Sequence, residues 1–169
     1  MHDYLGMNLD YTIKCEVKIT MIPYIKEMIQ DFREHDPIPD KKANNPAEEF
    51  LFTVDDESRM VDDSRAKVFH TFVAKALLAT KRSRPEIHTE VAFLTARVWG
   101  PNKDDWKKLL RLVHYLRNTT KMPLTIRADG TNIDKWWVDG SYDVHPDMRS
   151  QTGGTMLRGM GAIISTYIK

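Results

Sequence analysis

The sequence contains very little cysteine and has no long apolar run. Cys15 is the only cysteine among 169 residues, which excludes an internal disulfide framework and any cysteine-based zinc site. No run of about 18 apolar residues occurs, so we expect no membrane span. The first residues lack the basic start and apolar stretch that are typical of a secretory signal. These absences predict an intracellular protein in a reducing compartment, with no membrane partner.

The formal net charge is also small, and taken alone its value of +1 argues against a nucleic-acid partner. However, the charge is unevenly distributed along the chain. Residues 30–63 contain 11 acids and 4 bases, whereas residues 64–127 contain 14 bases and 4 acids. Such an asymmetry indicates contact with a polyanion, although the same side chains are suited to solvating helix faces. Both interpretations stay open on charge alone.

Apolar spacing and turn residues predict two strands and a helix at the start of the chain. Residues 3–20 alternate loosely between apolar and polar, which predicts two short strands with a turn near residues 14–16. Pro23 opens a helix that ends before Pro37, because proline cannot continue it. The next segment, residues 36–63, is rich in proline, asparagine and acids. We expect it to be an irregular, exposed, acidic linker.

Three helices are predicted in the basic middle of the chain. The first follows an acidic start at Asp62 and Asp63, and the second begins at Pro85. The third has Asn102 as its N-cap, and Trp106 lies on its apolar stripe, where core packing is expected.

After residue 121 the pattern changes to strands. Residues 124–127 and 133–139 predict a strand pair with a turn at Asp129-Gly130. Residues 155–158 and 162–168 predict two more strands. The expected organisation is therefore a hairpin and helix, an acidic linker, a basic helical segment and a sheet, over residues 1–35, 36–63, 64–121 and 122–169.

Six separated blocks of the sequence occur in a recognisable order. They include Tyr4-Leu5-Gly6-Met7, Arg84-Pro85-Glu86-Ile87, Val138-Asp139, and Arg149-Ser150 with Thr152-Gly153. In this order the blocks resemble the C-terminal part of a copia-type LTR-retrotransposon reverse transcriptase, running into the start of its ribonuclease H domain. The resemblance spans nearly all of the chain. Glu86 departs from the family, which usually has Asp in its "RPDI" block.

The resemblance implies a fragment of a Pol polyprotein with RNA-directed DNA polymerase and ribonuclease H activities. It also implies an α+β fold, with an N-terminal β-hairpin plus thumb- or connection-like helices, followed by an incomplete ribonuclease H-like antiparallel sheet. The paired aspartates of the polymerase are expected upstream of Met1, and a further ribonuclease H carboxylate is expected downstream of Lys169. We therefore expect neither activity from this chain alone.

Asp139 matches the first ribonuclease H carboxylate, which is a Mg²⁺ ligand in the parent enzyme. Taken without the resemblance, Asp139 is better explained as the residue that ends a strand and starts the turn at Gly140. A two-metal site needs several carboxylates, so one carboxylate does not predict stable Mg²⁺ binding by this fragment.

The expected nucleic-acid partner is an RNA–DNA hybrid or a template–primer duplex, bound alongside the rest of the Pol polyprotein. The resemblance implies primer contact by the N-terminal hairpin, and the basic residues of the middle segment are suited to phosphate contacts. For each group the alternative is structural, namely a plain hairpin, a solvated loop or a solvated helix face. The candidate residues are Tyr4, Leu5, Gly6, Met7, Lys81, Arg82, Arg84, Lys107, Lys108 and Arg111.

Two other functions stay open. One is a non-catalytic nucleic-acid-binding module derived from such an element, which predicts binding that weakens steeply with salt. The other is a protein-interaction or relic domain without nucleic-acid affinity, which would assemble through apolar surface on the incomplete sheet.

Overall fold

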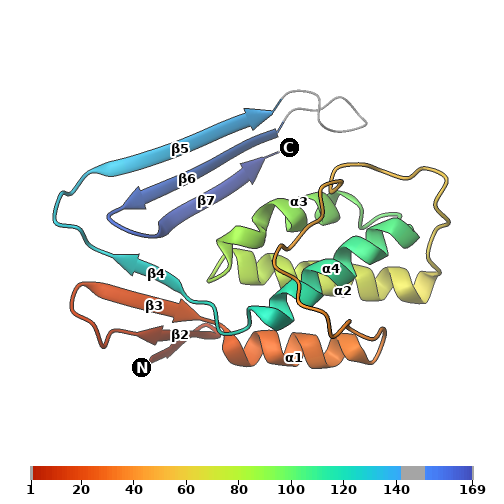
Figure 1. The fold of residues 1–169 in the computed structure, drawn as a ribbon, viewed down its shortest axis with the longest axis horizontal. Coiled ribbons are helices and arrows are strands. Elements are labelled where there is room, and N and C mark those ends of the chain that lie inside the picture. Colours follow the sequence, from red (N-terminus) through yellow and green to blue (C-terminus); the bar gives the residue numbers. More distant parts are fainter. Residues whose placement is uncertain (1, 142–150, 169) are drawn as a thin grey trace.

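A computed structural model describes residues 2–141 and 151–168. These residues form four α-helices, one short 3₁₀-helix and two antiparallel sheets (Figure 1). The prediction of an α+β fold is confirmed for this part of the chain. Arg149 and Ser150, which belong to one block of the resemblance, lie outside the described residues. Among the helices that are described, none is long and apolar enough to cross a membrane.

The N-terminal sheet has four strands, in the order β1 (His2–Tyr4), β2 (Met7–Asp10), β3 (Glu16–Thr20) and β4 (Leu124–Arg127). The first twenty residues therefore form three strands, not the two predicted. The turn expected near residues 14–16 is present, where the backbone N–H of Glu16 donates to the Ile13 carbonyl at 3.1 Å. The additional turn lies at Leu5-Gly6, where both residues have positive φ, as a two-residue type I′ hairpin turn requires.

The second sheet has three strands, in the order β5 (Asp134–Ser141), β6 (Gln151–Arg158) and β7 (Ala162–Ile168). The predicted pairing of residues 124–127 with 133–139 is wrong, because β4 pairs with β3 and places Ile126 opposite Val17. This pairing leaves Ile126 and Val17 half-buried. The two sheets meet where the backbones of Arg127 and Met160 exchange hydrogen bonds. Gly161 is needed there, because a Cβ atom would lie 1.9 Å from the Thr125 carbonyl oxygen.

The helical segments begin close to where the sequence predicts, although the segment predicted from Pro85 opens with a short 3₁₀ turn and its α-helix starts at His88. They are α1 (Ile22–Arg33), α2 (Asp63–Thr80), η1 (Pro85–Ile87), α3 (His88–Ala96) and α4 (Lys103–Asn118). The Asp62 side chain caps α2 by accepting from the Arg65 backbone N–H at 2.8 Å. Asn102 and Asp105 form a reciprocal capping box at the start of α4. In Figure 1 the helices form one body, and β7 lies next to α3.

The core lies between the helices. Phe32 of α1 packs edge-on against Phe72 of α2, with ring centroids 4.9 Å apart, and stacks on Trp106 of α4 at 5.7 Å. Trp106 is buried, as the apolar stripe predicts, and its indole N–H donates to Asp36 at 2.7 Å. An indole N–H needs such a partner when the ring is buried.

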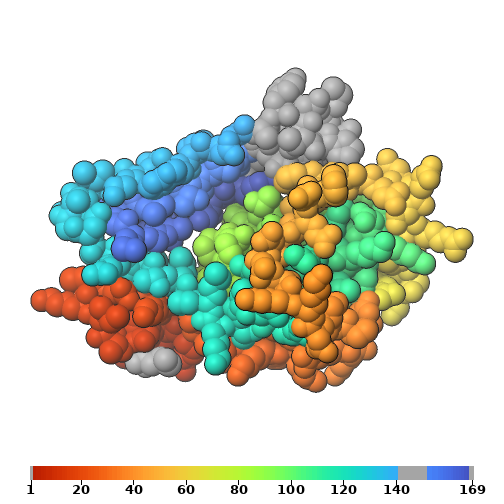
Figure 2. All heavy atoms as spheres, viewed as in Figure 1, coloured from red at the N-terminus to blue at the C-terminus, as the bar shows by residue number. Residues whose placement is uncertain are grey.

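Residues 36–62, here named the acidic strap, have no helix or strand, as predicted. Most of this segment is exposed, as expected, but three of its residues are buried. Ile38, Ala43 and Leu51 are buried in the core cluster, because they lie against the helices. Figure 2 shows the acidic strap, in orange and yellow, lying over the green surface of the helices.

Candidate nucleic-acid interface

The structure brings two candidate nucleic-acid elements together. The Arg82 guanidinium, just after α2, donates a hydrogen bond to the backbone carbonyl of Leu5 in the turn of the β1–β2 hairpin. Tyr4 and Leu5 are about 60% exposed (59% and 60%), although both are large apolar residues. We name the surface formed by Tyr4, Leu5, Gly6, Lys81 and Arg82 the hairpin patch.

Gly6 has a local reason to be glycine. Its φ is +78°, a conformation that L side chains rarely adopt, and the turn between Tyr4 and Met7 requires it. A Cβ atom at Gly6 would lie 3.5 Å from Nη1 of Arg82, which is ordinary contact. Backbone conformation, not lack of space, therefore favours glycine at this turn. Met7 lies half-buried against the core and is not part of the exposed surface.

Lys81 is the exposed cation next to Arg82. It caps the C-terminal end of α2, where a positive charge is favourable. Its ammonium nitrogen lies 3.5 Å from Nε2 of His88. Burial, with the Lys81 charge as a second cause, lowers the pKa of His88 below its usual value of 6.5. The neutral imidazole leaves the positive charge of Lys81 largely uncompensated on this surface.

Arg84 does not fit the predicted phosphate contact, because its side chain is completely buried. Its Nε donates to the Glu86 carboxylate at 2.5 Å, and Nη2 donates to Thr119 Oγ1 at 2.6 Å. The guanidinium also lies over the Tyr115 ring, 5.7 Å from its centroid. Arg84 therefore ties η1 to the C-terminal end of α4 and does not reach the surface.

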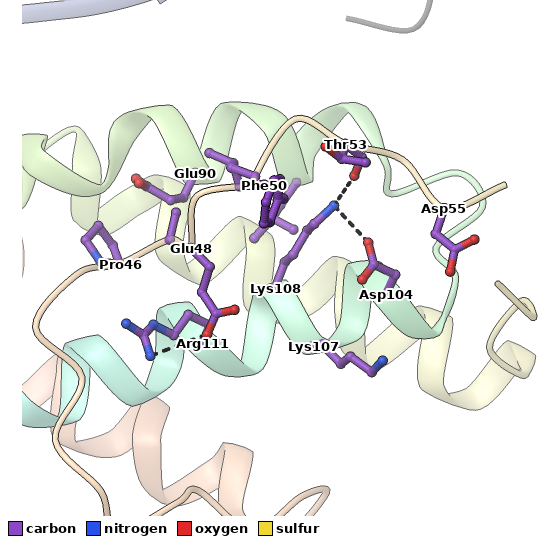
Figure 3. A pocket seen from close by; sticks show the side chains of 13 residues that line it. Pro46, Glu48, Phe50, Thr53, Asp55, Glu90, Asp104, Lys107, Lys108 and Arg111 are labelled. Carbon is purple, nitrogen blue, oxygen red and sulfur yellow. Dashed lines mark hydrogen bonds and ion pairs between the residues drawn. The ribbon is translucent and has the colours of Figure 1, made fainter. Parts of the chain in front are cut away.

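Of the three α4 cations that were predicted to contact phosphates, two are engaged within the chain and one is exposed. Lys108 donates to the Thr53 carbonyl at 2.5 Å and pairs with Asp104 at 2.8 Å (Figure 3). Arg111 donates to the Asn45 carbonyl at 3.0 Å and lies 3.6 Å from Glu48. Both side chains hold the acidic strap, which disagrees with their predicted contact with phosphates. Lys107 is exposed and has no partner within the described part of the chain.

Further side chains of α4 contact the acidic strap, although they were not predicted as site residues. Arg117 bonds the Ile38 carbonyl and Asp40, and His114 contacts the Lys41 carbonyl. The opposite net charges of residues 30–63 and 64–127 indicated an attraction between the two segments, but most of these donors bond backbone carbonyls of the strap, which charge does not reveal. Lys108 and Arg111, two of the predicted basic residues, are thus used to hold the chain's own acidic segment.

Asp139 lies on β5 opposite Gly153 of β6 and is exposed. It lines a cavity of about 520 Å³ between the second sheet and the start of α3, together with Trp137, His88 and Tyr167. Within residues 2–141 and 151–168 there is no group of three or more His, Cys, Asp or Glu side chains that is suited to a metal ion. Among the described residues Asp139 therefore belongs to no such group, whereas Mg²⁺ prefers octahedral oxygen ligation.

Glu90 of α3 was not predicted as a site residue. It lines a cavity of about 410 Å³ under residues 46–55 of the acidic strap (Figure 3). Glu90 is only 9% exposed, and burial raises the pKa of its carboxyl group to about 6. Burial, with the Glu90 charge as a second cause, also raises the pKa of Tyr167 to about 12. The sequence contains no signal for this environment, because the strap that covers Glu90 starts more than 30 residues earlier.

No family model of known proteins matches this chain, and neither does a curated protein or a solved structure. The function proposed below rests on the motifs of the sequence and on the geometry of the described residues.

Proposed function

We propose that this chain is the segment of a copia-type reverse transcriptase that contacts the template–primer and connects the polymerase to the ribonuclease H domain. Its partner is an RNA–DNA hybrid or a template–primer duplex, held in the rest of a Pol polyprotein. The chain alone carries out neither polymerisation nor RNA cleavage. The resemblance of the sequence supports the family, and the hairpin patch supports the nucleic-acid contact.

The hydrogen bond from Arg82 to the Leu5 carbonyl is the observation that carries this proposal. The hairpin and the basic cluster are 77 residues apart in sequence, and the two were expected independently to contact nucleic acid. Lys81 and Arg82 supply fixed positive charge beside an exposed turn. Such groups release counterions condensed on a nucleic-acid backbone, which favours binding at low salt.

The test is the salt dependence of binding to a fluorescently labelled RNA–DNA hybrid, measured by anisotropy on the whole chain. The variant Lys81→Ala/Arg82→Ala should weaken binding and reduce the slope of log affinity against log salt by about 1 to 2. The matched control, Lys42→Ala/Lys67→Ala, removes the same charge from exposed positions outside the hairpin patch. Equal effects of the two double variants, or binding that is insensitive to salt, would show that the hairpin patch is not the interface.

A second candidate function is supported by the second sheet. Trp136, Met156 and Ile164 are directly opposite one another on its three strands, so their side chains share one face. Trp136 and Ile164 are exposed, as is Val138 two residues along β5. An exposed apolar face of this kind favours a protein-interaction module.

Sedimentation at increasing protein concentration tests this candidate. If the chain is an interaction module, it assembles as its concentration rises, and Trp136→Ser/Ile164→Ser abolishes this assembly. The control Trp99→Ser changes an exposed tryptophan outside the sheet and should leave the assembly intact. A chain that stays monomeric and binds the hybrid would exclude it.

A further inference from the structure

The cavity next to Glu90 lies between the acidic strap and two helices. Residues 46–55 of the strap line it together with α3 and α4, and its volume of about 410 Å³ lies in the range of small-molecule pockets. The strap is fixed on both sides of this stretch. Asn45 accepts from Arg111 on one side, and the Asp55 carbonyl accepts from the Asn102 side chain at 2.9 Å on the other. The cavity therefore has a defined roof.

The cavity has an apolar floor and one buried carboxylate. Leu51 of the strap and Leu94 of α3 line it and are buried. Glu90 stands on α3 one turn before Leu94, and its Oε2 atom is buried without any hydrogen-bond partner in the described part of the chain. Burying a carboxylate oxygen without a hydrogen-bond partner destabilises the folded state. A ligand that donates a hydrogen bond there would remove this cost.

The charges that line the cavity determine which ligand fits. Of the three cations, Lys108 is paired with Asp104, and Arg111 is engaged by Glu48 and the Asn45 carbonyl. These pairs leave Lys107 as the exposed cation, against the carboxylates of Glu90 and Asp55. The unpaired groups of the lining therefore have a net negative charge, which favours a cation.

Phe50 supports the same ligand class. Its ring lines the cavity, although the residue is 71% exposed, which is unusual for phenylalanine. Figure 3 shows Phe50 among the labelled lining side chains, between Glu90 and Lys108. The face of an aromatic ring attracts organic cations. An aromatic ring and a buried carboxylate that line one cavity are thus an arrangement suited to an amine on an apolar body.

We propose that the cavity under residues 46–55 binds an organic cation, a protonated primary amine on an apolar body, with Glu90 as its counter-ion. The apolar body packs on Leu51 and Leu94, and the Phe50 ring covers it. The site shares no residue with the hairpin patch. Amine binding and nucleic-acid binding are measured with different ligands, so the failure of one proposal leaves the other unaffected.

The experiment titrates the whole chain with 2-phenylethylamine at pH 7.5 and follows backbone amide signals by NMR. The neutral isostere 2-phenylethanol is the control ligand. We expect saturable shifts at Glu90, Leu94 and Lys107 with the amine, and binding weaker by at least about ten-fold with the alcohol, because it lacks the charged hydrogen bond. Equal affinity for the two ligands, or no saturable shift with the amine, would overturn the proposal.

Variants separate the roles of the lining residues. Glu90→Gln keeps the shape of the side chain and should weaken amine binding by at least about ten-fold. Phe50→Leu, at an exposed position that the fold tolerates, should weaken it by about two- to five-fold. Glu49→Gln removes a strap charge outside the cavity and should change affinity by less than about two-fold. Thermal unfolding confirms that each variant is folded, and an equal loss in Glu49→Gln and Glu90→Gln would refute the assignment of Glu90.

Discussion

Arg82 donates a hydrogen bond to the backbone carbonyl of Leu5, and this contact joins the end of α2 to the turn of the N-terminal hairpin. The hairpin turn is otherwise exposed, and its two central residues have positive φ. Arg82 therefore supplies a direct side-chain contact between the turn and the end of α2.

Removing the Arg82 guanidinium should loosen the hairpin without unfolding the chain. Because the bond is exposed, Arg82→Ala should lower the free energy of unfolding by less than about 1 kcal/mol. Faster hydrogen exchange at the Met7 amide, which faces Tyr4 in the β1–β2 pair, is the expected local effect. Lys67→Ala, another exposed cation of the helical region, is the control. Unchanged exchange at Met7 would show that Arg82 does not position the turn.

Removing the Arg84 side chain, unlike removing that of Arg82, should strongly destabilise the fold. Arg84→Ala removes a fully buried side chain and the hydrogen bonds that it donates to the Glu86 carboxylate and to the Thr119 carbonyl. We expect a loss of about 2–4 kcal/mol in the free energy of unfolding, measured by urea denaturation. The affinity of the folded fraction for the hybrid should stay unchanged. If Arg84→Ala is as stable as the native chain but binds the hybrid more weakly, Arg84 belongs to the nucleic-acid interface after all.

Glu90 should make stability depend on pH in the weakly acidic range. Burial, with a smaller contribution from the Glu86 charge, raises the pKa of Glu90 from 4.5 to about 6 in the folded chain. The folded chain therefore binds the proton more tightly than the unfolded chain. It follows that the free energy of unfolding falls as the pH rises from about 4.5 to about 6, by up to about 2 kcal/mol.

Comparison with Glu90→Gln isolates this effect from other titrating groups, including His88. The variant should be more stable than the native chain above pH 6, by at most about 2 kcal/mol, and this gain should vanish below about pH 4.5. Urea denaturation at several pH values measures the difference. A gain that is the same at pH 4 and pH 7.5 would mean that the Glu90 proton is bound equally tightly in both states.

Asp139 should not support RNA cleavage in this chain. The purified protein, incubated with a labelled RNA–DNA hybrid and Mg²⁺, should leave the RNA strand intact, because one carboxylate does not form a two-metal site. Gel analysis of the RNA strand measures the outcome. Mg²⁺-dependent cleavage that is lost in Asp139→Asn but kept in Asp134→Asn, a change on the same strand, would contradict this prediction.

Local signals in the sequence correctly predicted where helices begin. Pro23 opens α1, Asp62 caps α2 and Asn102 caps α4, because each of these effects acts within about four residues of the chain. The strands over residues 162–168 and 124–127 were also predicted at the positions that the structure shows. Whether these segments form a helix or a strand therefore depends mainly on residues that are close in the sequence.

Tertiary contacts decided which strands pair and which charged side chains are buried. Local turn residues favoured pairing of β4 with the strand that follows it, yet β4 pairs with β3, about 100 residues earlier in the chain. Charge alone could not separate the exposed Lys81 from the buried Arg84, since both lie in one basic cluster. Nor could it show that Lys108 and Arg111 hold the acidic strap. Sequence composition specifies which charges are present, whereas packing over long sequence separations decides which of them water and a nucleic acid can reach.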